Sequence, residues 1–503
     1  MACNFPIQAI NPAAVDQIVG QTLTAQVTVQ PDLQATITPL GPTAMPPFYG
    51  LQTATPGVVL PALTGSPQPP GDSCDYVTQP GDTLPALAGR FGVDPSQVTA
   101  PISLPAQALI PPGIRLVIPN TLSAVSAPDA LLPDSEVVNS PSVVGFNMDA
   151  LITQGGGFLS TYTETVADQQ FSGAQIVKRA ADETSINPRL LLAVLEFRSH
   201  WVLGQPAPGA SLDYPIGFEV PGQKGLYAEL SLTGKLLNIG YYGWRAGSLT
   251  SLTFPDQKTL RIHPALNAGS AALAYLFSRL SPFSRWESAL YGSADFLTLY
   301  QSMLGDPWVR AAAIEPLLSP QVQPPQLELP FAPDERWSFT SGPHPAWTTG
   351  SPPGALDFAP VTGEPHCAVS AAWVTASAPG RVVRVGNGVV MVDLDGDGYE
   401  QTGWDILYMH IADQDRVPLG TWLNTNDRVG HPSCQGGQAT GTHVHIARKY
   451  NGEWIAAYGP FPMALSGWMV EPGTKPYQGF LRMGAQVVSS SPGGDHTSII
   501  VRH

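Results

Sequence analysis

The segment Gly441-Thr442-His443-Val444-His445-Ile446 decides how the last third of this 503-residue chain is interpreted. β-Branched or apolar residues alternate with the two histidines, which is the pattern of a short strand. Because side chains on a strand repeat every two residues, we expect His443 and His445 on the same face. One imidazole can then ligate a metal while the other handles a proton or stabilises an oxyanion. A metal site at this pair would need further protein ligands from elsewhere in the chain.

Apolar runs surround this segment from about residue 329 to about residue 483. They predict strands at 381–385, 389–392, 406–409 and 442–448, separated by turns rich in Gly or Asp. We therefore expect residues 331–485 to form an all-β domain, preceded by a linker at 319–330 and followed by a tail at 486–503.

Three upstream residues can complete a metal site. A zinc peptidase needs three protein ligands and an open position for water. His344 lies in a predicted turn, and Asp357 follows thirteen residues later in the apolar segment Gly354-Ala355-Leu356-Asp357-Phe358. A carboxylate in such a segment is costly unless it meets a cation. His410 ends another predicted strand and can face the same site.

These pieces resemble the lysostaphin-type (LytM) zinc metallopeptidases, which cut peptidoglycan cross-bridges, over roughly residues 335–470. The Gly-Pro-His to Leu-Asp-Phe spacing and Cys434, nine residues before His443, are similar to the β-lytic and staphylolysin branch. The fold that this resemblance implies is an antiparallel β-sheet. The implied Zn²⁺ ligands are His344, Asp357 and His445, and the implied catalytic histidines are His410 and His443.

Two weaker features lie in the same domain. Cys367 and Cys434 are its only cysteines, and a disulfide between them is one option in an oxidising compartment. The run Asp393-Leu394-Asp395-Gly396-Asp397-Gly398 matches the start of a calcium loop. Position twelve would be Trp404 instead of Glu, which excludes a full EF-hand. A solvated hairpin turn is the alternative, and we favour it.

Length and composition restrict the number of domains and the kinds of partner. The length favours about three units, and residues 1–73 read as a Pro-rich spacer. Charged residues make up only 13% of the chain, and its net charge of −15 argues against a nucleic-acid partner. No apolar stretch is long enough to predict a transmembrane helix. The start resembles that of a mature lipoprotein, with Cys3 as the lipid-bearing residue; an ordinary cysteine is the alternative.

Residues 74–119 resemble a LysM domain, through Tyr76-Val77, Gly81-Asp82-Thr83-Leu84 and the closing run Ile114–Pro119. A small α+β unit is expected, with Asp82 or Thr83 capping a helix. The resemblance implies binding of polymers that contain N-acetylglucosamine, such as peptidoglycan, and we take Gly81, Asp82 and Thr83 as candidate contacts. A degenerate spacer is the alternative.

Residues 120–160 are expected to be a linker, and 161–318 an all-α domain with helices near 190–201, 226–237, 267–280 and 293–304. The start of the first of these helices resembles a lysozyme-like transglycosylase. Arg198 stands where that family has its catalytic acid, and a guanidinium cannot donate a proton at neutral pH. Glu196 is the nearest substitute but points elsewhere on the helix. We expect this domain to be catalytically inactive.

The sequence thus predicts an extracellular or envelope-attached peptidoglycan hydrolase, a zinc endopeptidase targeted by its LysM-like unit. Its membrane contact would be limited to a lipid at Cys3. The alternative is a non-catalytic cell-wall-binding or scaffold protein. A third reading, glycan cleavage through Glu196, predicts release of reducing sugar that chelators do not suppress.

Overall fold

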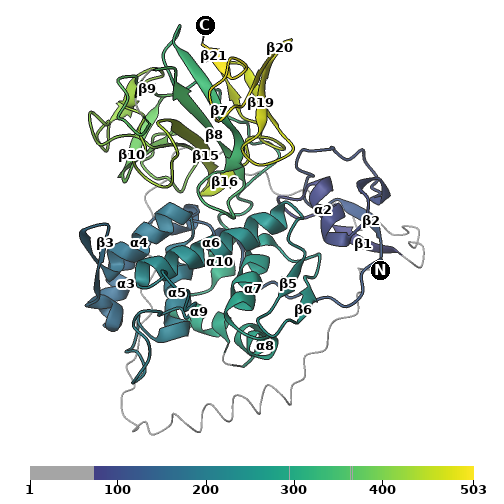
Figure 1. The fold of residues 1–503 in the computed structure, drawn as a ribbon. Helices are drawn as coiled ribbons and strands as arrows, with labels where there is room; N and C mark the ends of the chain where they lie inside the picture. The colour runs from purple at the N-terminus through teal and green to yellow at the C-terminus, as the bar shows by residue number, and fades with distance from the viewer. Residues whose placement is uncertain (1–72, 294, 363, 365, 503) are drawn as a thin grey trace.

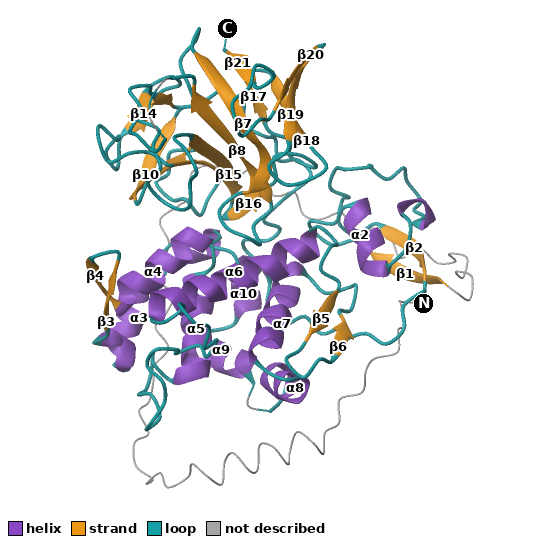
Figure 2. Ribbon diagram, in the orientation of Figure 1, coloured by secondary structure: helices purple, strands orange, loops and turns teal. Residues whose placement is uncertain are grey.

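The computed structural model describes residues 73–293, 295–362, 364 and 366–502. Cys3 and nearly all of the expected spacer lie outside these residues. Three parts follow one another: a small unit at 73–119, a helical unit at 120–318 and a β unit at 331–502 (Figure 1). Helices dominate the middle part and strands the last part (Figure 2). In the described part of the chain, no helix is both long and apolar enough to cross a membrane.

The small unit is a mixed α+β structure, as expected. Its strands β1 (Ser73–Val77) and β2 (Arg115–Pro119) pair antiparallel, with helix α2 (Leu84–Phe91) and the 3₁₀ turn η1 (Pro95–Gln97) between them. The hydroxyl of Thr83 accepts the amide hydrogen of Ala86 and caps α2. The helix buries its apolar face against the two strands.

The helical unit contains the four helices that the periodicity predicts, and more. Its elements are α3 (Met148–Gly155), α4 (Gly173–Thr184), α5 (Pro188–Ser199), α6 (Leu226–Arg245), α7 (Ala268–Leu280), α8 (Phe283–Tyr291), α9 (Phe296–Leu304) and α10 (Pro307–Ala311). Asn187 caps α5 and Pro188 begins it, as expected. Two small hairpins, β3–β4 (Thr163–Val166, Gln169–Ser172) and β5–β6 (Ser251–Thr253, Thr259–Arg261), make the unit mixed instead of all-α.

The linker expected at residues 120–160 is wrong. Val137 and Val138 are fully buried in the core of the helical unit. The side chain of Asp134 accepts the amide hydrogen of Gly269 at the start of α7. The segment contributes only short 3₁₀ turns and α3, so it lacks the periodicity that would have identified it.

The β unit is built on a nine-stranded sheet in the order β13-β10-β11-β12-β15-β8-β7-β21, with β16 paired to β15. All of its pairings are antiparallel, as predicted. The strands are β7 (Arg336–Pro345), β8 (Pro353–Pro360), β10 (Gly380–Gly386), β11 (Val389–Asp393), β12 (Trp404–Met409), β13 (Trp422–Leu423), β15 (Val444–Tyr450), β16 (Glu453–Ile455) and β21 (Ile499–Val501).

Two smaller sheets complete the β unit. One pairs β9 (Val374–Thr375) with β14 (Arg428–Gly430); the other contains β17 (Ala464–Leu465), β18 (Trp468–Pro472), β19 (Gly479–Met483) and β20 (Gln486–Ser489). Residues 486–503 are therefore not the expected tail. They supply β20 and the edge strand β21, which pairs with β7.

The two faces of the large sheet have different neighbours. Val444 and Ile446 point into the core of the β unit. Ala447 belongs to the apolar cluster of the helical unit, as does Leu407 on the adjacent strand. His445 alternates with Val444 and Ile446, so it shares the face that the helical unit covers.

Arg245, at the end of α6, joins the three units. Its guanidinium donates to the carbonyl of Pro80 in the small unit and to Asp134 in the helical unit. It also donates to Glu453 on β16, at 2.9 Å. One partly buried cation thus holds polar groups from all three parts of the chain.

Candidate metal centre and active site

Three adjacent strands bring the three expected ligands together. His344 lies near the end of β7, Asp357 is in the middle of β8, and His445 is the second residue of β15. The register places His445 directly opposite Asp357. All three side chains are at least nine-tenths buried. The sheet therefore sets their positions without help from loops.

The three ligand atoms converge closely. Nε2 of His344 lies 3.1 Å from Nδ1 of His445. Oδ1 of Asp357 is 3.3 Å from each of these nitrogens. Ligand atoms about 2.0–2.1 Å from a zinc ion in a tetrahedron are separated by roughly 3.3 Å. The spacing in the structure fits that requirement.

Hydrogen bonds fix which ring nitrogen is available for a metal. His344 donates from Nδ1 to the carbonyl of Gly342, and His445 donates from Nε2 to the carbonyl of Ala346. Because a carbonyl only accepts, the converging nitrogens of the two neutral rings present lone pairs. Oδ1 of Asp357 also receives no hydrogen bond within the described part of the chain. Three lone-pair acceptors this close together repel one another unless a cation lies between them.

The side chains of the site shift one another's pKa values. The surrounding histidines hold the pKa of Asp357 well below its ordinary value, and they outweigh the burial that would raise it. Burial lowers the pKa of His445. For His344, burial lowers the pKa but Asp357 more than compensates, so the pKa is raised. The anionic carboxylate is what a divalent cation requires.

The other two expected histidines lie beside this group. His443 directly precedes β15, and His410 directly follows β12; their ring centroids are 4.4 Å apart. Each ring donates from Nδ1 to a backbone carbonyl, that of Gly441 for His443 and that of Gln435 for His410. Each Nε2 is therefore left to accept a proton. Burial, reinforced by His443 and His445, lowers the pKa of His410 to about 4, so it is neutral at neutral pH.

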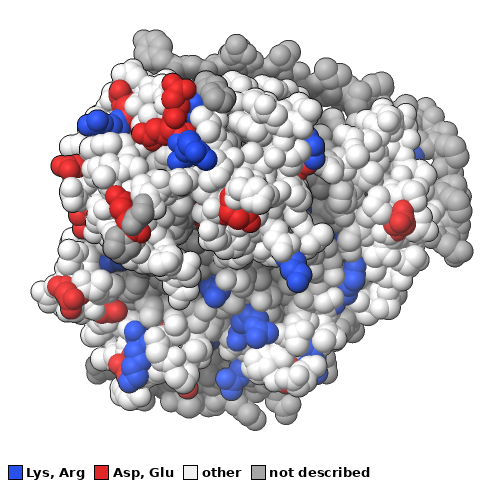
Figure 3. Space-filling view, turned by 45° about the horizontal axis from the view of Figure 1, so that its top comes forward, with Lys and Arg blue, Asp and Glu red and all other residues white. Residues whose placement is uncertain are grey.

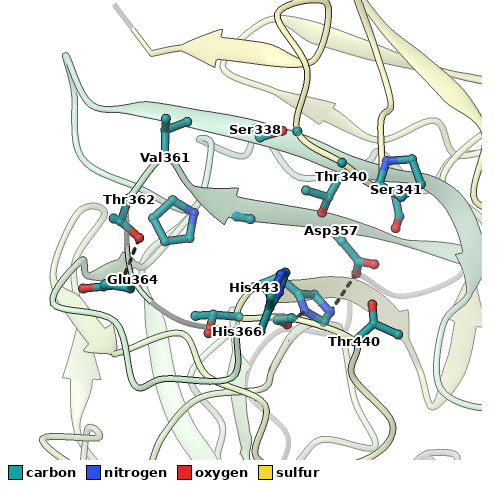
Figure 4. Close-up of a pocket in the computed structure, with 17 residues that line it drawn as sticks. Ser338, Thr340, Ser341, Asp357, Val361, Thr362, Glu364, His366, Thr440 and His443 are labelled. Atoms are coloured by element: carbon teal, nitrogen blue, oxygen red, sulfur yellow. Dashed lines mark hydrogen bonds and ion pairs between the residues drawn. The ribbon is translucent and has the colours of Figure 1, made fainter.

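An open cleft of about 330 Å³ adjoins the site, and Asp357 and His443 form part of its wall. In Figure 4 these two side chains point toward each other at one end of the cleft. The remaining wall is rich in hydroxyl groups and glycine, including Thr340, Ser341 and Thr440. A polypeptide backbone offers the donors and acceptors that such a wall can bind.

The expected disulfide is present. Cys367 and Cys434 are bonded and stand 67 positions apart in the sequence. Cys434 stands beside Gln435, whose carbonyl orients His410. The hydroxyl of Thr442, next to His443, donates to the carbonyl of Ala368. The bond thus fixes two loops that border His410 and His443.

Sequence reasoning missed Tyr477, in the connection between β18 and β19. Its ring stacks on His344 with centroids 4.6 Å apart, and half of its surface is exposed. Its backbone carbonyl accepts the amide hydrogen of Gly342. No spacing rule connects residues so far apart in the chain, so the sequence carried no signal for it.

The candidate glycan contacts of the small unit have structural roles. Asp82 is buried, forms an ion pair with Arg90 and accepts the hydroxyl hydrogen of Tyr76. Thr83 caps α2. Gly81 has a φ of +84°, and a Cβ there would overlap Arg245 of the helical unit. The fold and the inter-unit contact thus engage all three residues, and their contact with a glycan stays a prediction.

Glu196 is likewise structural. Its carboxylate is buried and accepts the amide hydrogens of Val202 and Leu203 after the end of α5. Arg198 donates to the carbonyl of Ile216. Neither side chain is placed for acid catalysis, which agrees with an inactive helical unit.

Comparison with known proteins shows that part of this chain is similar in sequence to LasA. Residues 130–318 match the family described as LasA, N-terminal domain. Protease LasA of Pseudomonas aeruginosa strain PAO1 is 26% identical over 296 residues, covering 55% of this chain and 67% of the relative. The LasA of strain UCBPP-PA14 is also 26% identical over 296 residues.

Solved structures match smaller parts of the chain. The M23 metalloprotease pseudoalterin from the deep sea is 20% identical, covering 33% of this chain and 95% of that protein, with a TM-score of 0.28. The catalytic domain of lysostaphin from Staphylococcus simulans is 19% identical, covering 24% and 89%, with a TM-score of 0.18. The three converging side chains fit a zinc ion, and the relative that matches 55% of this chain is named a protease.

Proposed function

We propose that this chain is a zinc-dependent endopeptidase that cleaves the cross-bridge peptides of peptidoglycan. The observation that carries the proposal is the convergence of His344, Asp357 and His445 at the spacing of a tetrahedral zinc site. The similarity to protease LasA supports it.

Each residue of the site has a distinct task. A bound Zn²⁺ would polarise the scissile carbonyl and lower the pKa of a coordinated water. Nε2 of one free histidine accepts a proton from the water that attacks. The other histidine stabilises the oxyanion or returns a proton to the leaving amine. The lowered pKa of His410 keeps its ring neutral at neutral pH, so its Nε2 carries a lone pair.

Several features support a substrate in the cell wall. The cleft beside Asp357 and His443 is lined by small polar residues, which suits a peptide with small side chains. The disulfide favours an oxidising, extracellular or envelope location. On the face that Figure 3 draws, basic side chains are scattered over a largely uncharged surface and form no continuous patch. Such a surface suits an uncharged peptide better than a nucleic acid.

We further propose that the small unit binds glycan, as its resemblance to LysM suggests, with the half-buried Thr83 as the most accessible of the three candidate contacts. The helical unit would then act as a spacer or glycan-binding part, without catalysis of its own. Lipidation of Cys3 also remains a proposal. A non-catalytic wall-binding protein is the competing function, and metal-dependent turnover discriminates between the two.

The test is mass analysis of the fragments that the purified zinc-loaded chain releases from isolated peptidoglycan. We expect new amino termini in the cross-bridge peptides, and none after chelation or in the His445→Ala variant. Exposed His496, far in sequence from the ligands, provides a matched control through His496→Ala. Release of reducing sugars that persists with chelator would instead favour glycan cleavage. Intact cross-bridges at full zinc occupancy would favour the non-catalytic alternative.

A further inference from the structure

A second group of potential metal ligands lies in the connection between β11 and β12, on a part of the β unit that the proposed mechanism does not use. Carboxylate oxygens of Asp393, Asp395 and Asp397 all lie within 4.8 Å of one another. Asp393 is buried at the end of β11, whereas Asp395 and Asp397 are exposed. Crowding of like charges is unfavourable unless a cation offsets it.

Asp405 provides an independent observation. It lies on β12 directly opposite Asp393, so both side chains share one face of the sheet. Asp405 is fully buried, and neither of its carboxylate oxygens has a hydrogen-bond partner among the described residues. An unsatisfied buried carboxylate costs several kcal/mol. Because Asp405 shares a sheet face with Asp393, its unpartnered carboxylate lies on the side of the sheet where the aspartate loop begins.

The neighbouring cations do not balance these acids. Lys449 lies opposite Asp405 on its other side, but its ammonium is nearest to Glu400, at 3.9 Å. Arg384 also pairs with Glu400, at 2.9 Å. Lys178 on α4 pairs with its own neighbour, Asp182. These three cations leave the four aspartates of the connection and β12 without a direct ion-pair partner.

We propose that the connection from Asp393 to Asp405 binds one calcium ion, with Asp393, Asp395, Asp397 and Asp405 as its carboxylate ligands. The first three stand at positions 1, 3 and 5 of a calcium loop, and Gly396 and Gly398 allow the chain to turn tightly around the ion. The distal acid stands at position 13 instead of 12. It can serve because strand pairing, and not helix geometry, brings it back to Asp393. An all-oxygen set on a flexible, glycine-containing loop favours Ca²⁺ over Mg²⁺.

Binding there would tie the loop of the β11–β12 hairpin to both of its strands. His410 directly follows the other end of β12, and α4 of the helical unit reaches the same region through Asp182. The ion would therefore act on the stability of the β unit without contacting the zinc ligands. Its loss is expected to lower the melting temperature while the zinc content stays unchanged.

The experiment uses the full zinc-loaded chain, desalted and titrated with CaCl₂ by calorimetry. We expect one saturable site, and a rise in Tm of roughly 3 °C or more at saturating calcium. Terbium offers a second readout, because the Trp422 ring lies against Gly396 and can sensitise luminescence of a bound Tb³⁺. Excess calcium should displace the bound Tb³⁺ and abolish its luminescence, whereas magnesium at the same concentration should not.

Two exposed positions make the variants interpretable. Asp395→Asn and Asp397→Asn are expected to weaken calcium binding at least tenfold without preventing folding. Asp415→Asn, at an exposed loop position elsewhere in the β unit, serves as the matched control and should bind as the parent does. Asp405→Asn should also weaken binding; calcium affinity equal to the parent's would overturn its role as a ligand. Absence of saturable Ca²⁺ and Tb³⁺ binding, or equal affinity in the two exposed variants, would overturn the site itself.

Discussion

Replacing His443 and His445 separately tests whether two histidines on one face have different tasks. Nδ1 of His445 lies 3.1 Å from Nε2 of His344 and 3.3 Å from Asp357, within the group that fits a zinc ion. Nε2 of His443 is 3.8 Å from the same carboxylate, and its side chain is 15% exposed at the cleft. The first variant should therefore lose the metal and the second should keep it.

The expected magnitudes differ accordingly. His445→Ala removes one of three protein ligands, so zinc should fall well below one equivalent and activity should disappear with it. His443→Ala removes a proton-transfer or oxyanion-stabilising group. Such a group contributes roughly 10²–10⁴-fold to the rate, or about 3–5 kcal/mol of activation free energy. We expect that loss in kcat at one equivalent of zinc.

The assay measures zinc per mole of purified protein by elemental analysis and kcat on a cross-linked muropeptide. His496→Ala, at an exposed residue of the same unit, should match the parent in both. If His443→Ala also loses its zinc, or turns over substrate at the parental rate, the division of roles is refuted. Zinc retention in His445→Ala would refute the ligand set.

Three further predictions concern stability. Reducing or replacing the Cys367–Cys434 bond opens a loop of 67 residues and should lower the free energy of unfolding by about 4 kcal/mol in denaturant titrations; an unchanged midpoint would contradict this. Burial and nearby Asp134 raise the pKa of Glu315 to about 7. The folded-state pKa of Glu315 exceeds its unfolded value. Its contribution to the free energy of unfolding should therefore be complete below about pH 4 and should be lost as pH rises through about 7. Glu315→Gln should flatten that slope, and a parental profile would argue against it. Arg245→Ala leaves the buried carboxylates of Asp134 and Glu453 without their cation. The free energy of unfolding should fall by about 3–5 kcal/mol in the same titrations. A loss under 1 kcal/mol would show that water satisfies the two carboxylates.

Local signals account for what the sequence predicted correctly. Asn187-Pro188 begins α5 because the cap and the fixed φ of proline act within one turn. The four predicted strands around His443 appear because short apolar runs rich in β-branched residues favour a strand. Residues 120–160 and 486–502 are not the expected linker and tail, because long-range contacts order them. Their own sequences have no period for a pattern rule to detect.

The sequence by itself determined the chemistry of the site: His443 and His445 on one strand face, and the residue types at 344, 357 and 410 that can join them. Only the tertiary structure decided which atoms do so. The pairing of β7, β8 and β15 brings three lone-pair atoms to 3.1–3.3 Å, and backbone carbonyls select the nitrogen each ring presents. It also placed Tyr477 against His344, the helical unit over the face that carries the site, and Asp405 opposite Asp393. These arrangements depend on strand register and on packing between units, which no local pattern in the chain encodes.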